Sequence, residues 1–245
     1  MIPIRDTIPS RSTPYVVYGL IAVNALVYFK TNLGLPPGAQ QRFFQLYGIV
    51  PARYADPQIA HALWRSNPVF PFFTSMFLHG GLLHVLGNMW TLWIFGDNVE
   101  DWFGHGRFLL FYLFCGVASG LMHLFANWGS ALPTIGASGA IAGVMGAYFL
   151  LYPRARVLTL LPIFFVFFVE LPAYVFLGFW FLLQLLSGAA SGAGAGGIAW
   201  WAHVGGFLAG AAVVFILGGG RPKRPSSSRP TLKPLWQKVD EYWRE

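Results

Sequence analysis

Charge is scarce in this chain of 245 residues. Only 10% of the residues are charged and 56% are hydrophobic, whereas an ordinary soluble domain has about 25% charged residues. This composition excludes a typical soluble domain and indicates an integral membrane protein. Cysteine is nearly absent as well, and the single Cys115 excludes an internal disulfide.

The net charge of +7 has a simpler explanation than binding to nucleic acid. Seven of the sixteen Lys and Arg residues follow residue 220. Such a cluster is typical of a tail that is kept on the cytoplasmic side of a membrane. We therefore expect the lipid bilayer, and no nucleic acid, as a partner of this chain.

Long apolar segments recur along the chain. A transmembrane helix needs about 20 mostly apolar residues, and six segments approach this requirement, at 14–29, 82–98, 108–127, 135–152, 171–187 and 198–217. We predict an all-α integral membrane protein built as a bundle of six transmembrane helices. Residues 13–219 would form the membrane domain, with cytoplasmic tails at 1–12 and 220–245.

Three stretches between these segments do not have the character of spans. Residues 31–80 are apolar but interrupted by prolines and arginines, which predicts a loop that lies in the interface or partly re-enters the bilayer. Residues 157–169 are too few to cross and contain Pro162, so we predict an interfacial or re-entrant segment. Residues 187–197 are almost wholly Gly, Ala and Ser, which predicts a flexible linker.

The positive charges predict the orientation of the bundle. With six spans and both termini inside, twelve Lys and Arg residues lie inside and four outside, as expected when the termini are cytoplasmic. The tail has apolar residues at spacings of three and four, which predict an amphipathic helix on the membrane surface. A disordered tail is the alternative. The apolar tail residues are Leu232, Leu235, Trp236, Val239 and Trp243.

Four polar residues from three predicted helices lie at one depth. Ser138 is near the start of the fourth span and His203 near the start of the sixth. His84 and Asn88 are four residues apart and so share one face of the second. With six spans, all four lie roughly one turn below the outer surface. A His inside a span is costly and indicates function, and a Ser within its reach is a candidate nucleophile.

Small residues would allow these helices to approach closely. Gly139 and Gly143 form one GxxxG pair, and Gly206 and Gly210 form another. Alone, such pairs indicate packing rather than catalysis. Likewise, a serine in a span often bonds to its own helix, and the two histidines with Asn88 could be structural. Ser119, His123 and Cys115 are interpreted as packing residues.

Other protease chemistries are excluded by what is missing. The His-Glu-x-x-His motif of zinc proteases does not occur. His79 and His84 are five residues apart, so they would not lie on one face of a helix as a pair of metal ligands. No two of the nine acids form an aspartyl pair within apolar spans. No acid is expected near His203 either, which favours a Ser-His dyad over a triad. We expect no cofactor and no metal.

At these residues the chain strongly resembles the rhomboid family of intramembrane serine proteases. The likeness extends from about residue 70 to residue 217 and rests on four stretches: His84-Val85-Leu86-Gly87-Asn88, residues 100–108, Gly136-Ala137-Ser138-Gly139, and Ala202-His203-Val204-Gly205-Gly206.

The resemblance implies a role for each site residue. Ser138 would be the nucleophile and His203 its general base, while His84, Asn88 and the Ser138 backbone N–H would form the oxyanion hole. It also implies a six-helix bundle whose water-filled cavity opens to the outer face. The substrates would be transmembrane proteins with a single span, cut near the outer face. We expect a functional monomer in a prokaryotic inner membrane.

The chain departs from the family pattern at two places. The residue four positions after the serine is often aromatic in the family and stacks on the histidine, but here it is Ala142. Trp200 or Trp201 would then have to hold the imidazole. The Trp-Arg pair of the first loop has only a distant counterpart in Trp64-Arg65.

Two alternative functions remain open. A non-proteolytic relative would bind or dislocate client helices, but such relatives lack the Ser/His pair that this chain keeps. A transporter is disfavoured because the six spans show no obvious repeat. In a protease, the fifth span and the 187–197 linker are the best candidates for a substrate gate.

Overall fold

The computed structural model describes residues 1–63, 67–163, 165–191 and 198–219. Three sequence predictions concern segments outside this range. These are the Trp64-Arg65 counterpart, most of the 187–197 linker, and the tail after residue 219 with its amphipathic helix.

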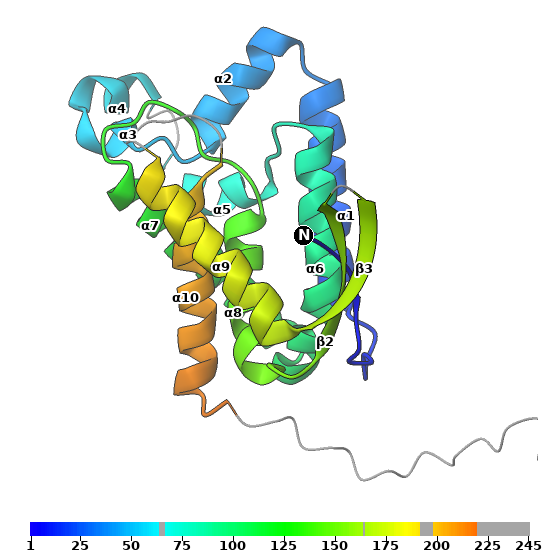
Figure 1. Cartoon of the computed structure of the whole chain (residues 1–245). Helices are drawn as coiled ribbons and strands as arrows, with labels where there is room; N and C mark the ends of the chain where they lie inside the picture. Colours follow the sequence, from blue (N-terminus) through cyan, green and yellow to red (C-terminus); the bar gives the residue numbers. More distant parts are fainter. Residues whose placement is uncertain (64–66, 164, 192–197, 220–245) are drawn as a thin grey trace, which may run out of the picture.

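The main helices follow the six predicted apolar segments closely (Figure 1). They are α1 (Tyr15–Tyr28), which continues as the π-helix η1 (Phe29–Leu33), α6 (Leu82–Phe103), α7 (His105–Ala126), α8 (Ser138–Leu151), α9 (Ala173–Ala190) and α10 (Trp200–Ile216). Among the residues that the structure describes, three helical stretches are long and apolar enough to span a membrane: Tyr15–Leu33, His105–Ala126 and Ala173–Ala190. α8 and α10 are shorter apolar helices. The six-span topology therefore remains a prediction.

The connection between α1 and α6 is helical rather than an open loop. It contains α2 (Pro37–Tyr47), α3 (Ala52–Ala55), α4 (Pro57–Leu63), α5 (Pro71–Thr74) and the 3-10 helix η2 (Ser75–Phe77). The buried Arg53 donates from one guanidinium nitrogen to the carbonyls of Gln45 and Leu46, at 2.5 and 3.2 Å. Because the last carbonyls of a helix have no partner within it, these bonds satisfy the end of α2 and fold the connection back on itself.

Acids at the end of α6 cap the start of α1. The buried Glu100 carboxylate accepts hydrogen bonds from the backbone N–H groups of Val16 and Val17, at 3.0 and 2.9 Å. Asp101 accepts from the N–H groups of Arg11 and Ser12. A negative charge at a helix N-terminus satisfies free N–H groups and interacts favourably with the helix dipole. These acids thus fix where the first helix begins against the second.

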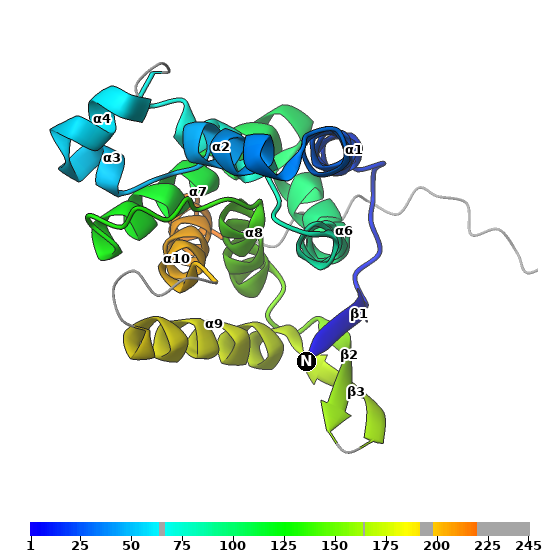
Figure 2. The ribbon, with the colours of Figure 1, turned by 90° about the horizontal axis from the view of Figure 1, so that it is seen from above.

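Helix α8 lies at the centre of the bundle, among α6, α7, α9 and α10 (Figure 2). Every residue from Gly139 to Tyr148 is buried. Glycines bring α10 into backbone contact with it: a Cβ on Gly206 would lie 1.9 Å from the Gly139 carbonyl oxygen, and a Cβ on Gly210 would lie 1.9 Å from that of Gly143. The predicted close approach through both GxxxG pairs is confirmed.

A three-stranded antiparallel sheet, which the sequence did not predict, stands beside α6 (Figure 1). Its strands are β1 (Ile2–Asp6), β2 (Arg156–Ile163) and β3 (Phe165–Pro172), paired in the order β1-β2-β3. Residues 157–169, predicted as an interfacial or re-entrant segment, form most of the β2–β3 hairpin, and part of the predicted tail 1–12 forms β1. The fold is mostly helical, as predicted, with this sheet added.

The sheet forms because its sequence suits strands and because β1 is held at both ends. Residues 157–169 are rich in Val, Leu and Phe, and β-branched and aromatic side chains pack well on a pleated surface. The Trp90 indole N–H of α6 donates to the Pro3 carbonyl at 2.6 Å. The Tyr148 hydroxyl of α8 donates to the Asp6 carboxylate. The N-terminal strand is therefore attached to the helical bundle.

Candidate active site

Ser138 is the first residue of α8, and the chain reaches it through a turn that only glycine permits. Gly136 has a φ of +131°, and a Cβ there would lie 2.7 Å from His84 Nε2. Side chains rarely adopt such positive φ values. The Gly136 N–H donates to the Ser75 carbonyl at 2.9 Å, which fixes the turn. Glycine at this position therefore lets the chain pass close to the His84 imidazole and start a central helix two residues later.

His203 lies in the first turn of α10 and meets the serine directly. Its Nε2 is 2.8 Å from Ser138 Oγ, within the range of a good hydrogen bond. The close packing of α8 and α10 through glycine produces this distance, because Ser138 and His203 lie at the neighbouring ends of the two helices. The structure thus brings together the two residues that the sequence paired as nucleophile and base.

Gln184 of α9 is a site residue that the sequence analysis missed. Its Oε1 lies 2.8 Å from His203 Nδ1, where a triad would place a carboxylate. A signal was available, because Gln184 is the only amide or charged side chain in Ala173–Ala190. Its burial beside His203 could not be deduced from the sequence alone, since a lone amide in a span can equally bond to its own helix.

Aromatic rings flank the His203 imidazole in place of the residue at Ala142. The Trp180 ring lies 5.7 Å from the imidazole centroid at an interplanar angle of 35°. Trp200 was one of the two residues predicted to hold the imidazole. Its ring centroid lies 6.5 Å from that of His203, and the two rings are perpendicular, at 90°. The more nearly parallel ring therefore comes from α9 and not from Trp200.

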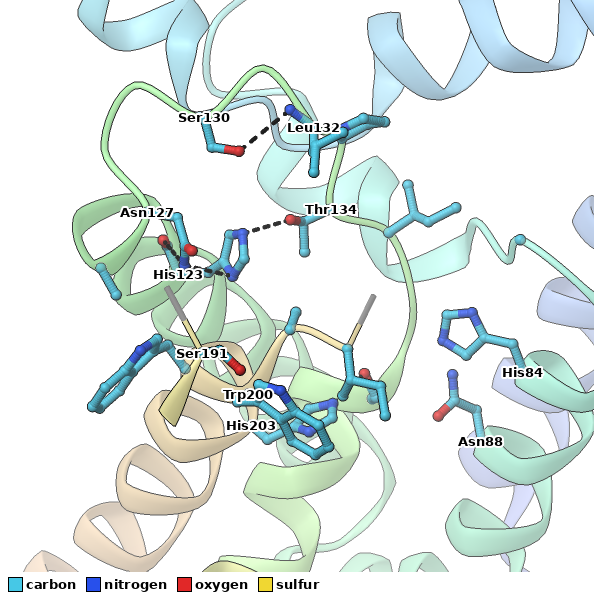
Figure 3. Close-up of a pocket in the computed structure, with 18 of the residues that line it drawn as sticks. His84, Asn88, His123, Asn127, Ser130, Leu132, Thr134, Ser191, Trp200 and His203 are labelled. Atoms are coloured by element: carbon cyan, nitrogen blue, oxygen red, sulfur yellow. Dashed lines mark hydrogen bonds between the residues drawn. The ribbon is translucent and has the colours of Figure 1, made fainter. Parts of the chain in front are cut away.

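His84 and Asn88 project from α6 on the opposite side of the cavity from Trp200 and His203 (Figure 3). The Asn88 amide nitrogen is 2.9 Å from His79 Nε2. Burial and the neighbouring His84 lower the pKa of His79 to about 4, so His79 is neutral near pH 7 and accepts this bond. One amide hydrogen of Asn88 is thereby committed to His79, and the other is free to donate into the cavity.

The cavity that these residues line has a volume of about 660 Å³. His123, Asn127 and Thr134 lie on another part of its wall, where His123 Nε2 is 2.6 Å from Thr134 Oγ1 (Figure 3). His123 was predicted to be a packing residue, and it lines the cavity instead. Ser119 and Cys115 do pack, since a Cβ on Gly139 or Gly143 would collide with them.

No metal ligand set accompanies these groups. Across the part of the chain that the structure describes, no three His, Cys, Asp or Glu side chains lie together as ligands. The cavity instead brings together a hydroxyl bonded to an imidazole and, across from them, side-chain donors from α6. This combination is suited to nucleophilic attack on a carbonyl and to stabilisation of the resulting oxyanion.

Comparison with known proteins shows which proteins this chain is similar to. Rhomboid protein 1, mitochondrial, of Saccharomyces cerevisiae is 30% identical over 147 residues, which are 58% of this chain and 38% of the yeast protein. Presenilin-associated rhomboid-like protein, mitochondrial, of Mus musculus is 31% identical over 151 residues, which are 60% of this chain and 36% of the mouse protein. Rhomboid protease GluP of Bacillus subtilis is 42% identical over 74 residues, which are 30% of this chain and 14% of the bacterial protein.

The aligned parts span less than half the length of each of these relatives. The family itself is established by a longer match, because residues 61–220 match the model of the Rhomboid domain. This match covers more than half of the chain, and the chain is therefore a membrane protein that belongs to the rhomboid family.

Proposed function

We propose that this protein is an intramembrane serine endopeptidase that cuts single-span membrane proteins with a Ser138-His203 dyad. One observation carries the proposal: Ser138 Oγ lies 2.8 Å from His203 Nε2 at a cavity that His84 and Asn88 also line. Members of the rhomboid family are generally intramembrane serine proteases, and the Bacillus subtilis relative is named a rhomboid protease.

In the proposed mechanism, each step of hydrolysis is carried out by one of these groups. Ser138 Oγ attacks the peptide carbonyl carbon while its proton passes to His203 Nε2. The negative charge that develops on the carbonyl oxygen is stabilised by donors from His84, Asn88 and the Ser138 backbone N–H. His203 then gives the proton to the leaving amine, and an acyl-enzyme remains. A water molecule, deprotonated by His203, hydrolyses this ester and restores the serine.

The setting of the cavity supports a transmembrane substrate. Water does not enter the hydrocarbon region of a bilayer, so a cavity lined with polar groups inside an apolar bundle would supply the water that hydrolysis needs. The proposal includes an opening toward the outer face and both termini on the inner face, on the basis of the charge count. It also includes a functional monomer and substrate entry past α9 and the 187–197 linker.

The proposal places the protein in a lipid bilayer and does not specify whether that membrane is bacterial or mitochondrial. The sequence predicted a prokaryotic inner membrane, but the yeast and mouse relatives are named mitochondrial and do not favour it. The Bacillus subtilis relative is bacterial. The chemistry of the dyad is the same in either membrane.

A cleavage assay tests the proposal. Detergent-purified protein is incubated with a single-span test substrate and, separately, with a fluorophosphonate probe. The wild type should cut the substrate and take up the probe, and both Ser138→Ala and His203→Ala should do neither. Ser119→Ala is the matched control, because this serine is buried on α7 and packs against Gly139, and it should keep both activities.

The two outcomes separate the candidate functions. Cleavage or labelling that persists in the Ser138→Ala protein would overturn the assignment of the nucleophile. A folded wild type that binds the substrate without cutting it or reacting with the probe would support the non-proteolytic alternative.

A further inference from the structure

We propose that Gln184 is a positioning residue that fixes the tautomer of His203. This inference rests on the proposed function, since it concerns the base of the same dyad. A neutral imidazole carries its proton on one of two nitrogens, and only the form with a free Nε2 lone pair can accept the Ser138 proton. The surroundings of Nδ1 determine which form is present.

The orientation of the Gln184 amide follows from a backbone carbonyl. Gln184 Nε2 donates to the Trp180 carbonyl oxygen at 3.2 Å, one helical turn earlier in α9. A carbonyl oxygen only accepts hydrogen bonds. If the amide were turned over, Gln184 Oε1 would face this carbonyl as a second acceptor. The amide nitrogen must therefore point to Trp180, and Oε1 must point to His203.

The imidazole tautomer follows from the amide in the same way. Gln184 Oε1 can only accept, and it lies 2.8 Å from His203 Nδ1, so Nδ1 must carry the proton. Nε2 then holds the lone pair and accepts the hydrogen bond from Ser138 Oγ at 2.8 Å. Three hydrogen bonds therefore connect the Trp180 carbonyl, Gln184, His203 and Ser138, and each has a fixed donor and acceptor. In this arrangement His203 Nε2 is ready to take the proton of Ser138 Oγ.

Burial strengthens the preference for these hydrogen-bond directions, because water is not available as an alternative partner. Gln184 is 5% exposed and His203 is 9% exposed. Within the protein interior, a buried polar group without a hydrogen bond is unfavourable, so the amide and the ring both favour the arrangement in which each is satisfied. Trp180 flanks the same ring. α9 therefore contributes the acceptor, the carbonyl that orients it and a flanking ring.

The placement of these groups on α9 links the position of this helix to the state of the base. α9 runs obliquely across the bundle in front of α8 and α10 (Figure 1). A hydrogen bond of 2.8 Å is lost beyond about 3.5 Å. A shift of α9 by less than about 1 Å away from α10 would therefore release Nδ1. If substrates enter past α9, this helix must return before His203 is again held as a base.

Two substitutions of similar size distinguish positioning from packing. Gln184→Met fills the space without an acceptor. Gln184→Glu keeps an oxygen acceptor for Nδ1–H, and its protonated form can also donate to Trp180. We expect kcat to fall by about 10-fold to 100-fold in the Met variant, the loss typical when the hydrogen-bond partner that orients a metal-ligating histidine is removed, with KM little changed. The Glu variant should retain much more of its turnover.

Leu183→Met is the matched control, because Leu183 is the neighbour of Gln184 on α9 and is 41% exposed. It should leave kcat and KM unchanged. Thermal melting of each variant shows that it is folded. If Gln184 served only to fill space, the apolar Met variant would be at least as active as the Glu variant, and that order would overturn the proposal.

Nitrogen-15 NMR of histidine-labelled protein gives a readout that does not need proteolysis. The His203 signals, identified by their loss in His203→Ala, should report a protonated Nδ1 in the wild type and a mixture of tautomers in the Gln184→Met protein. An unchanged tautomer in the Met variant would refute the inference. Persistent cleavage by Ser138→Ala would instead refute the proposed function, so the two failures are distinguishable.

Discussion

Adding one methyl group at Gly206 should separate the two residues of the dyad. A Cβ at this position would lie 1.9 Å from the Gly139 carbonyl oxygen, whereas an ordinary carbon–oxygen contact is about 3.3 Å. To accommodate alanine, α10 must therefore move away from α8 by roughly 1.4 Å at this level. The obstacle is backbone on a central helix, so it cannot rotate aside as a side chain could.

The dyad lies within one turn of this contact. Ser138 precedes Gly139, and His203 lies three residues before Gly206, so most of the shift reaches the 2.8 Å hydrogen bond between them. A misplacement of about 1 Å can reduce catalysis by about 10²-fold. Overpacking of a close contact costs about 1–3 kcal/mol of stability. The Gly206→Ala protein should therefore lose most of its turnover and melt at a lower temperature.

The assay compares cleavage rate, fluorophosphonate labelling rate and melting temperature with those of Gly19→Ala. Gly19 lies in α1 and has open space where a Cβ would be added, so this control should keep full activity. Its melting temperature should stay the same or rise slightly, because alanine favours a helix over glycine by up to about 1 kcal/mol. If the Gly206→Ala protein matches this control in all three measurements, the argument from backbone contact is wrong.

Three further outcomes are expected. Asn88→Ala should lower kcat by about 10²–10³, the usual cost of losing one oxyanion donor, and should lower the melting temperature modestly because His79 Nε2 loses its partner. Early melting with retained specific activity would show that Asn88 is structural. Burial raises the pKa of Asp6 from 3.8 to about 6, so the folded protein holds this proton more tightly than the unfolded chain does. The free energy of unfolding therefore decreases as the pH rises between these two values. Wild-type melting temperature should fall more over this interval than that of Asp6→Asn, and equal falls would contradict the shift. In a cysteine-free protein, Ala131→Cys and Arg154→Cys should react with an impermeant reagent from opposite sides, and same-side labelling would refute the six-span topology.

The site could be found from the sequence because its residues are marked by local context. Ser138 and His203 each stand among small residues in apolar segments, and His84 and Asn88 share a face by their spacing of four. An apolar segment of sufficient length specifies a helix in a membrane without knowledge of its neighbours. The six helical segments were therefore predicted to within a few residues, and α8 was placed with its serine at the start.

The sheet and Gln184 needed the tertiary structure, because their roles depend on partners far away in the sequence. Ile2 pairs with Leu160, and no pattern within the first six residues predicts this distant pairing. The hydrophobicity of residues 157–169 was recognised, but a short apolar run does not distinguish a strand from a helical segment.

Gln184 was visible as a lone amide, yet its function depends on His203 in the next helix and on the Trp180 carbonyl in its own. The sequence by itself determined that this is a membrane bundle and which serine and histidine it carries, because apolar length and small-residue context are local properties. Only the packing of α9 against α10 decided what holds the histidine, because a hydrogen bond between two helices depends on their relative placement in three dimensions.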